Sequence, residues 1–252
     1  MLAELLELAP SGVEELPLAD GTVEYAVYGA PGELPALPDL TAAAGEALVE
    51  VSTQEIADDW EHRWRQFHKP LVLDQRLTVR PPWERPAGRT ELDVVIDPGQ
   101  AFGTGAHPTT RLCLELLLSL RPAGPLVDLG CGSGVLAITA AKLGFRPVVG
   151  LDYDPAAVQA AVQNARQNGV EVDVRRFDLR IDPLPAAPTV LANLLGPLLV
   201  ELAPRLPRDV ERLIVSGLLA EEADRVAAAF RDRGLRLCER RDMAGWTALL
   251  IA

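Results

Sequence analysis

Residues 126–152 constrain the fold of this chain more than any other stretch, and they read LVDLGCGSGVLAITAAKLGFRPVVGLD. The opening apolar residues predict a buried strand over residues 126–128, and a glycine-rich loop follows it. Val135–Leu143 then predicts a helix that Gly144 ends. Residues 148–151 predict a second strand, parallel to the first. Together these elements predict a right-handed βαβ unit.

The loop between the first strand and the helix carries Gly130, Gly132 and Gly134. Because glycine has no Cβ atom, the backbone can turn sharply here, close beneath a ligand. We expect Ser133 to cap the helix that follows. Asp152 lies at the tip of the second strand, where a carboxylate can accept hydrogen bonds from both hydroxyls of a ribose. The stretch therefore predicts a nucleoside cofactor, bound by Gly130, Gly132 and Asp152.

The spacing of the glycines indicates which cofactor this is. A dinucleotide site has the pattern G-x-G-x-x-G, whereas this loop has the pattern D-x-G-x-G-x-G, beginning at Asp128. The loop resembles motif I of S-adenosylmethionine-dependent methyltransferases, and we favour that class over a nicotinamide enzyme. A glycine-rich turn in an α/β domain without a ligand would leave the pair of Asp128 and Asp152 unexplained.

Strand-like and helix-like segments alternate along the rest of the C-terminal part. The further predicted strands are residues 172–177, 189–192, 213–217, 235–240 and 247–251, and the further predicted helices are residues 109–120, 155–168 and 221–233, with one more that follows Asn193 and continues to Leu206. This alternation predicts an α/β fold with a doubly wound, mostly parallel, seven-stranded Rossmann-like sheet.

The N-terminal residues 1–57 predict a smaller α+β module. Its predicted helices are residues 2–8 and 41–47, and its predicted strands are residues 21–28 and 48–52. A self-contained α+β sandwich would have a strand before its first helix, so we expect either that Met1 is a late start or that this module is incomplete.

A connecting helix and a catalytic domain are expected after this module. Ser52 and Glu55 have the spacing of a capping box for a helix that ends at Pro70, and we assign residues 58–70 to the connector. The catalytic domain is then residues 71–252. At its start we expect residues 71–79 to form one strand and the proline-rich residues 81–88 to form a stiff linker.

Acidic residues are concentrated in the N-terminal module. The first 59 residues hold thirteen Asp and Glu and no Lys or Arg, in a chain of net charge −12. Such a surface repels a phosphate backbone and attracts a basic protein. The same residues could equally form a solvated acidic face that favours solubility.

A second glycine-rich loop, residues 97–110, precedes the cofactor strand and reads DPGQAFGTGAHPTT. We expect this loop to fold over the cofactor, with Phe102 and Thr104 in contact with it. Thr110, in the first turn of the next helix, can donate a hydrogen bond to a carboxylate that the helix N-terminus also attracts. His107 could act as a base, but we favour a structural or substrate-positioning role for it.

Two more polar side chains follow strands whose carboxyl ends face the same crevice. Asp178, after the third strand, could meet the adenine amino group. Asn193, after the fourth, could accept a hydrogen bond from an amine and aim its lone pair at a methyl group, so we assign Asn193 to catalysis and to the cofactor site. Asn193 could instead cap the next helix. Leu194 and Trp246 are expected as apolar walls of the substrate pocket.

With these residues assembled, the sequence resembles the ribosomal protein L-11 methyltransferase family (PrmA type) from about Ser52 to the C-terminus. The matching segments are DWEHRW (residues 59–64), IDPGQAFGTGAHPTT (96–110), VDLGCGSG (127–134), GLDYDP (150–155) and ANLLGP (192–197). The segment FGTG-A-H-P-T-T is the most specific of these, because many unrelated methyltransferases share the glycine motif.

The resemblance implies a cofactor, an activity and a partner. It implies S-adenosyl-L-methionine, held at Thr110, Gly130, Asp152 and Asn193. It implies methyl transfer to lysine or N-terminal amino groups of ribosomal protein L-11. It also implies a ferredoxin-like N-terminal domain that holds this basic protein, joined to the catalytic domain through a flexible helix.

Three alternatives remain beside this function. The same class of enzyme could act on another basic protein or on a small amine. A nucleic-acid methyltransferase is disfavoured, because the segment after Asn193 lacks the prolines and the aromatic residue of an N-P-P-Y motif and because the N-terminal module is acidic. A binding module that retains the cofactor pocket without catalysis is the third.

The sequence also bears on location. No apolar run reaches membrane-spanning length, and no basic segment precedes an apolar one at the N-terminus. Cys113, Cys131 and Cys238 lie far apart without metal-ligand spacing. We therefore expect a reduced, cytoplasmic monomer that contacts no membrane, binds no nucleic acid directly and holds no metal.

Overall fold

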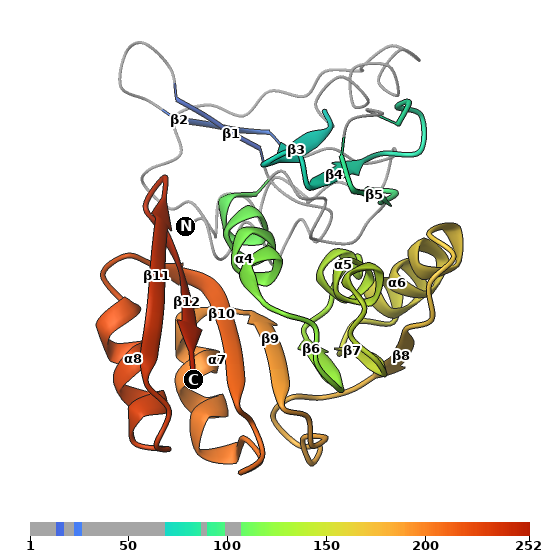
Figure 1. Cartoon of the computed structure of the whole chain (residues 1–252). Helices are drawn as coiled ribbons and strands as arrows, with labels where there is room; N and C mark the ends of the chain where they lie inside the picture. The colour runs from blue at the N-terminus through green and yellow to red at the C-terminus, as the bar shows by residue number, and fades with distance from the viewer. Residues whose placement is uncertain (1–13, 18–22, 27–68, 87–89, 99–106) are drawn as a thin grey trace. The chain divides into compact units, whose positions relative to one another are not determined.

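The computed structural model describes residues 14–17, 23–26, 69–86, 90–98 and 107–252. The chain divides into two compact units, residues 1–61 and residues 62–252. In the first unit, β1 (Glu14–Pro17) and β2 (Val23–Ala26) pair in antiparallel fashion (Figure 1). β2 lies within the strand predicted over residues 21–28, and β1 was missed. The other elements predicted before residue 69 lie outside the described residues.

The second unit contains a seven-stranded sheet in the order β11-β12-β10-β9-β6-β7-β8 (Figure 1). Its strands are β6 (Leu126–Leu129), β7 (Val148–Asp152), β8 (Asp173–Arg176), β9 (Thr189–Asn193), β10 (Arg212–Leu219), β11 (Leu237–Met243) and β12 (Trp246–Ile251). β6 to β10 are parallel, and β12 is antiparallel to both of its neighbours. The predicted seven-stranded, mostly parallel α/β fold is confirmed.

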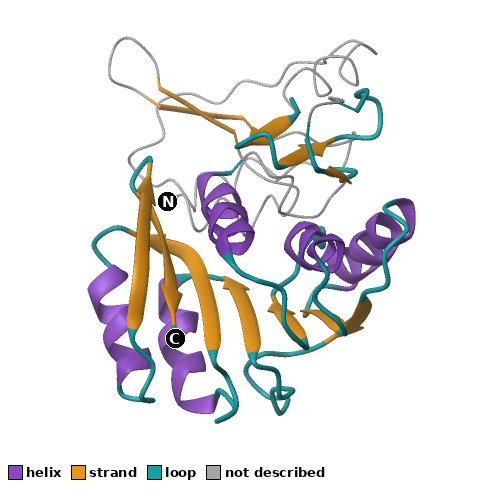
Figure 2. Ribbon diagram, viewed as in Figure 1, coloured by secondary structure: helices purple, strands orange, loops and turns teal. Residues whose placement is uncertain are grey.

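Helices cover both faces of this sheet (Figure 2). They are α4 (Pro108–Ser119), α5 (Val135–Leu143) and α6 (Pro155–Gln167) on one face, and α7 (Gly196–Leu202) and α8 (Ala223–Arg231) on the other. Side chains of β6 alternate between the two cores, because neighbouring residues of a strand point to opposite faces. Leu126 packs with α4 and α5, whereas Val127 packs with α7 and α8. The sheet is therefore doubly wound.

The helix predicted to continue to Leu206 is shorter than expected. α7 ends at Leu202, and Ala203–Arg205 forms a 3₁₀ turn. Pro204 lies inside this turn and has no backbone N–H to donate to the α-helical ladder, which accounts for the change.

Residues 71–79 form two strands rather than the single strand predicted. β3 (Leu71–Leu73) and β4 (Leu77–Arg80) are antiparallel, and Leu73 pairs with Leu77. The chain reverses between them because Asp74 and Gln75 have φ angles of 45° and 57°, in the left-handed region. The proline-rich stretch predicted as a stiff linker connects β4 to its parallel neighbour β5 (Leu92–Val95), which was missed.

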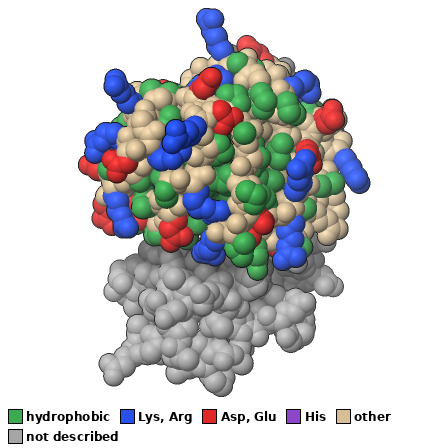
Figure 3. Space-filling model, turned by 90° about the horizontal axis from the view of Figure 1, so that it is seen from below, with side chains coloured by type: hydrophobic (Ala, Val, Ile, Leu, Met, Phe, Trp, Pro, Cys, Tyr) green, Lys and Arg blue, Asp and Glu red, His purple; other side chains and the backbone are tan. Residues whose placement is uncertain are grey.

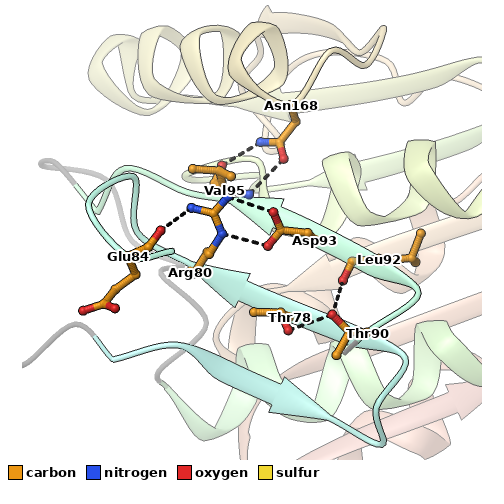
Figure 4. A network of polar contacts seen from close by, with 8 residues as sticks. All are labelled: Thr78, Arg80, Glu84, Thr90, Leu92, Asp93, Val95 and Asn168. Atoms are coloured by element: carbon orange, nitrogen blue, oxygen red, sulfur yellow. Dashed lines mark hydrogen bonds and ion pairs between the residues drawn. The ribbon is translucent and has the colours of Figure 1, made fainter. Parts of the chain in front are cut away.

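Side-chain contacts join β4 to β5 in this three-stranded sheet (Figure 4). Arg80 on β4 makes a two-pronged ion pair with Asp93 on β5, through Nε–Oδ1 and Nη2–Oδ2 distances of 2.8 Å. Thr78 and Thr90 share a hydrogen bond of 2.8 Å. A bidentate Arg–Asp pair fixes both distance and orientation, so these contacts set how β4 and β5 lie side by side.

Charge is distributed differently in the two parts of the sequence. Removing the thirteen acids of residues 1–59 from the total of 36 leaves 23 Asp and Glu against 24 Lys and Arg. Figure 3 shows Lys and Arg side chains interspersed with Asp and Glu on the face seen from below. In the part of the chain that the structure describes, no helix has the length and apolar character needed to cross a bilayer.

Candidate active site

The predicted site residues come together at the carboxyl ends of β6, β7 and β9. The glycine loop follows β6, Asp152 ends β7 and Asn193 ends β9. Parallel pairing places these three ends at the same edge of the sheet. The first turn of α4 reaches this edge as well, because the Asn193 amide donates to Thr110 Oγ1 at 3.4 Å.

The glycine loop has the conformation that its sequence predicts. Gly130, Gly132 and Gly134 have φ angles of 71°, 52° and 82°, which residues with a side chain rarely adopt. The N–H groups of Gly130 and Cys131 both donate to the carbonyl of Leu151, at 2.8 and 3.0 Å. The loop is therefore fastened to β7 by its backbone.

The expectation that Ser133 caps α5 is wrong. The N-cap residue is Gly134, and it contributes no side chain. Ser133 Oγ accepts a long hydrogen bond, 3.4 Å, from Val135 N–H. Asp128 takes this role instead, because its Oδ2 accepts a hydrogen bond of 3.1 Å from the Ala137 N–H in the first turn of α5. The acid that caps α5, Asp128, therefore comes before the glycine loop in the sequence and is buried in the fold.

Asp128 is fully buried, and its environment disfavours the charged form. Among the described residues, its Oδ1 atom has no hydrogen-bond partner. Burial raises the pKa of Asp128 to about 7, the hydrogen bond from Ala137 opposes this shift, and the negative charge of Asp152 adds to it. The pKa values of the buried thiols Cys113 and Cys131 are also raised, mainly by burial. Neither cysteine is thus a thiolate nucleophile at neutral pH.

We expect Asp128→Asn to flatten the pH dependence of stability. The folded-state pKa of about 7 exceeds the ordinary 3.8, so the wild-type protein loses stability as pH rises between these values. The loss approaches about 4 kcal/mol, at about 1.4 kcal/mol per pKa unit. The amide oxygen of asparagine can still accept from Ala137.

Urea unfolding of both proteins at pH 5 and pH 8 checks this expectation. Relative to wild type, Asp128→Asn should be more stable at pH 8 than at pH 5, with a free energy of unfolding that is larger by about 2 to 3 kcal/mol. Groups common to both proteins cancel in this comparison. An equal difference at the two pH values would show that Asp128 ionises normally.

Asp152 holds the loop and retains acceptor capacity. Its Oδ2 accepts from Gly132 N–H at 2.8 Å, and its Oδ1 accepts from Asp154 N–H at 3.0 Å. A carboxylate has about four acceptor positions, so two remain for the hydroxyls of a ribose. The side chain is partly exposed, as a ligand contact requires. These residues fit the nucleoside part of S-adenosyl-L-methionine.

Asn193 and Leu194 lie between the glycine loop and β10. Leu194 N–H donates to Ser216 O at 2.9 Å. A Cβ atom at Gly130 would lie 2.5 Å from Leu194 Cδ2, and one at Gly217 would lie 2.5 Å from Leu194 O. Because both positions are glycine, Leu194 can lie close to the glycine loop and to β10, and this placement of Leu194 holds the neighbouring Asn193. Asn193 does not cap α7, whose N-cap is Leu195.

His107 and Trp246, two predicted pocket residues, are in contact. Their ring centroids are 5.0 Å apart at an interplanar angle of 68°, an edge-to-face arrangement. His107 is also the N-cap of α4, where Nδ1 accepts from Thr109 N–H at 3.3 Å. Burial lowers the pKa of His107, which favours the neutral ring. This geometry supports a positioning role for His107.

The remaining predicted site residues have different outcomes. Asp178 closes a turn, because its Oδ1 accepts from Arg180 N–H at 2.9 Å and its own N–H donates to Asp182 Oδ2 at 2.9 Å. A contact from Asp178 to adenine stays a prediction. Phe102 and Thr104 lie outside the described residues. Within the described ranges, no cluster of His, Cys, Asp or Glu is arranged to hold a metal ion.

Sequence reasoning missed two groups that shape the site. Gly217 lies inside β10, where a glycine commonly marks a bulge, and the register of β10 with β12 shifts between Val215 and Leu218. Asn164 on α6 and Asn168 at its C-cap lie four residues apart, and Asn164 is buried among the alanines Ala157, Ala161 and Ala165. The spacing of Asn164 with these alanines along one helix face was the available signal.

The strand order, the loop of pattern D-x-G-x-G-x-G and the acid at the tip of β7 together define a class I S-adenosylmethionine-dependent methyltransferase. The model of the family "Ribosomal protein L11 methyltransferase (PrmA)" matches residues 35–252. The chain belongs to this family.

Two relatives and two solved structures illustrate the similarity. Ribosomal protein L11 methyltransferase of Symbiobacterium thermophilum is 39% identical to this chain in a match that covers 77% of it. The corresponding protein of Azotobacter vinelandii is 41% identical in a match that covers 84% of it. The matches span 65% and 75% of those two proteins. Ribosomal protein L11 methylase of Lactobacillus delbrueckii subsp. bulgaricus has a TM-score of 0.65 at 28% identity, over 73% of this chain and 97% of that one.

A more distant structure shows the fold alone. The tRNA (uracil-54, C5)-methyltransferase of Pyrococcus abyssi, solved in complex with S-adenosyl-L-homocysteine, has a TM-score of 0.51 at 17% identity. The similarity covers 70% of this chain and 55% of that one.

Proposed function

We propose that this chain is a protein N-methyltransferase that transfers methyl groups from S-adenosyl-L-methionine to lysine or N-terminal amino groups of ribosomal protein L11. The observation that carries the proposal is the hydrogen bond from Asn193 to Thr110, beside the glycine loop whose Gly132 N–H donates to Asp152. Two relatives over most of this chain are named for the same substrate.

The chain's own residues position the reactants. The cofactor supplies an activated methyl group, so in-line approach of a neutral amine provides much of the acceleration. In the proposal Gly130, Gly132 and Asp152 hold the nucleoside, and Thr110 at the N-terminus of α4 holds the carboxylate. The side-chain oxygen of Asn193 accepts a hydrogen bond from the amine, which orients the nitrogen lone pair.

A lysine substrate must lose its proton before it can attack the methyl group. Deprotonating a lysine of the usual pKa, about 10.4, at pH 7 costs roughly 4 to 5 kcal/mol. Apolar surroundings reduce this cost, because they destabilise the ammonium form. Leu194 and Trp246 would supply such surroundings, with His107 packed against Trp246. The proposal requires no strong base.

The proposal assigns substrate binding to the N-terminal residues 1–57, a connecting helix to residues 58–70 and catalysis to residues 71–252. The thirteen acids of the first 59 residues suit a basic ribosomal protein and disfavour direct contact with nucleic acid. A monomer in the cytoplasm, where ribosomal proteins are made and assembled, completes the proposal.

We expect Asn193→Ala to separate binding from catalysis. The cofactor dissociation constant should change by no more than a few-fold, whereas the turnover number should fall by at least about tenfold, because the amine loses its orienting acceptor. Calorimetry and steady-state kinetics measure the two quantities. An unchanged turnover number would remove Asn193 from the mechanism.

Transfer of labelled methyl to purified ribosomal protein L11, followed by peptide mapping, tests the proposed function. Label on lysine or on the terminal amine supports it, and label that requires residues 1–57 supports their assignment to docking. Cofactor binding without label on L11 counts against this substrate and leads to a screen of other basic proteins and small amines.

A further inference from the structure

Two asparagines of α6 and its C-cap lie four residues apart and bond to different parts of the chain. Asn168 bonds to the edge of β5 (Figure 4). Its Oδ1 accepts from Val95 N–H at 2.9 Å, and its Nδ2 donates to Val95 O at 2.6 Å. One amide thus satisfies both backbone groups of Val95, as a neighbouring strand would.

Asn164 makes the equivalent pair of bonds to two separate segments. Its Oδ1 accepts from Asp97 N–H at 3.0 Å, just after β5. Its Nδ2 donates to Ser133 O at 2.9 Å, in the middle of the glycine loop. The side chain is 1% exposed, so no water replaces either bond without a rearrangement. A single planar amide therefore ties Asp97 to the glycine loop.

The glycine loop depends on outside groups for its shape. Ser133 lies between Gly132 and Gly134, two residues with positive φ and no side chain to restrict them. Asp152 holds the Gly132 N–H, and Asn164 holds the next carbonyl along the chain, that of Ser133. α6 packs directly on the loop here, because a Cβ at Gly134 would lie 3.0 Å from Ala161 Cβ.

We propose that Asn164 is a positioning residue for the cofactor, which sets the glycine loop through Ser133 O and couples it energetically to the backbone at Asp97. This inference rests on the proposed function, since it concerns the same cofactor site. It adds a residue that touches no reacting atom and acts through the loop. By reciprocity, cofactor binding must then stabilise the hydrogen bond at Asp97 N–H.

Asn164→Ala and its control Asn168→Ala test the proposal. Both remove an amide that bonds to the backbone at or just after β5, the buried one of Asn164 and the partly buried one of the C-cap Asn168, but only Asn164→Ala releases Ser133 O. Calorimetry with S-adenosyl-L-methionine should give a dissociation constant about tenfold higher for Asn164→Ala, and within about twofold of wild type for Asn168→Ala. The turnover number at saturating cofactor should change little in either. Equal effects of the two variants on the dissociation constant would overturn the proposal.

Amide hydrogen exchange gives a readout that a merely structural role would not move. In the wild-type protein the cofactor should slow exchange at Asp97, and in Asn164→Ala it should not. In Asn168→Ala the cofactor should still protect Asp97, although Val95 exchanges faster. Cofactor-induced protection of Asp97 that survives in Asn164→Ala would contradict the coupling.

A second variant keeps the test decisive if Asn164→Ala does not fold. Asn164→Asp retains the acceptor for Asp97 N–H and loses the donor to Ser133 O, so cofactor binding should weaken by at least as much. Wild-type affinity in Asn164→Asp would overturn the proposal. A wild-type protein that binds no S-adenosyl-L-methionine would instead overturn the proposed function, and the inference with it.

Discussion

Replacing Gly217 by alanine is expected to lower the turnover number by about a hundredfold, although the proposed mechanism gives Gly217 no contact with the substrate. The new Cβ would lie 2.5, 2.8 and 2.9 Å from the O, C and N atoms of Leu194. These are backbone atoms, so the clash cannot be relieved by a side-chain rotation. The chain at Asn193 and Leu194 must shift, and a displacement of about 1 Å at a catalytic group costs on the order of a hundredfold.

Gly234→Ala is a matched control for this experiment. Gly217 and Gly234 have similar φ angles, 84° and 88°, so alanine suffers similar backbone strain at both, of about 1 to 2 kcal/mol. A Cβ at Gly234 meets nothing within 4 Å. Gly234→Ala should therefore lose stability and keep its turnover number. Equal losses of activity in the two variants would show that strain, and not the contact with Leu194, is responsible.

Replacing Asp152 by alanine is expected to raise the cofactor dissociation constant by at least about a hundredfold. The variant loses the carboxylate proposed to accept from two ribose hydroxyls, and bonds to a charged group contribute about 1.5 to 3 kcal/mol each. It also leaves the N–H groups of Gly132 and Asp154 without their acceptor. Calorimetry with S-adenosyl-L-methionine and with S-adenosyl-L-homocysteine measures the effect.

Asp154→Ala separates this effect from the loss of a negative charge. Asp154 is exposed, two residues away, and caps α6 through a bond of 2.8 Å from Ala156 N–H. Its removal takes away the same charge and should cost about 1 kcal/mol of stability. The cofactor affinity should stay near that of wild type. A comparable loss of affinity would mean that Asp152 acts through the local electrostatic field alone.

The large sheet could be predicted because its signals are local. β6, β7 and β9 are short, mostly apolar runs that end at or beside glycine or a polar residue, and their tips fix where Gly130, Asp152 and Asn193 lie. The small sheet was harder, since β3 and β4 are only three and four residues long and are joined through Asp74 and Gln75 rather than through glycine. Such a turn has no strong sequence signature.

The errors at the site have one physical cause, which is that its decisive contacts are distant in sequence. Ser133 was expected to cap α5 from the adjacent position, yet Asp128 does so from nine residues before Ala137. Gly217 supports Leu194 from the neighbouring strand, and Asn164 reaches Ser133 across 31 residues. Propensity and periodicity describe neighbours along the chain, and so they could not find these contacts.

The glycine loop is held by residues on β6, β7 and α6, and this determines which segment would have to be grafted into another protein to keep its shape. A segment that ends at Asp152 would carry the two acids that bond to Ala137 and Gly132, and it would leave Asn164 behind. The smallest portable unit of the glycine loop and its supports therefore extends from β6 through the C-cap of α6, residues 126–168, and it does not include Thr110 or Asn193. A recipient scaffold must in addition offer a strand edge for Asn168 to hold, as β5 does here.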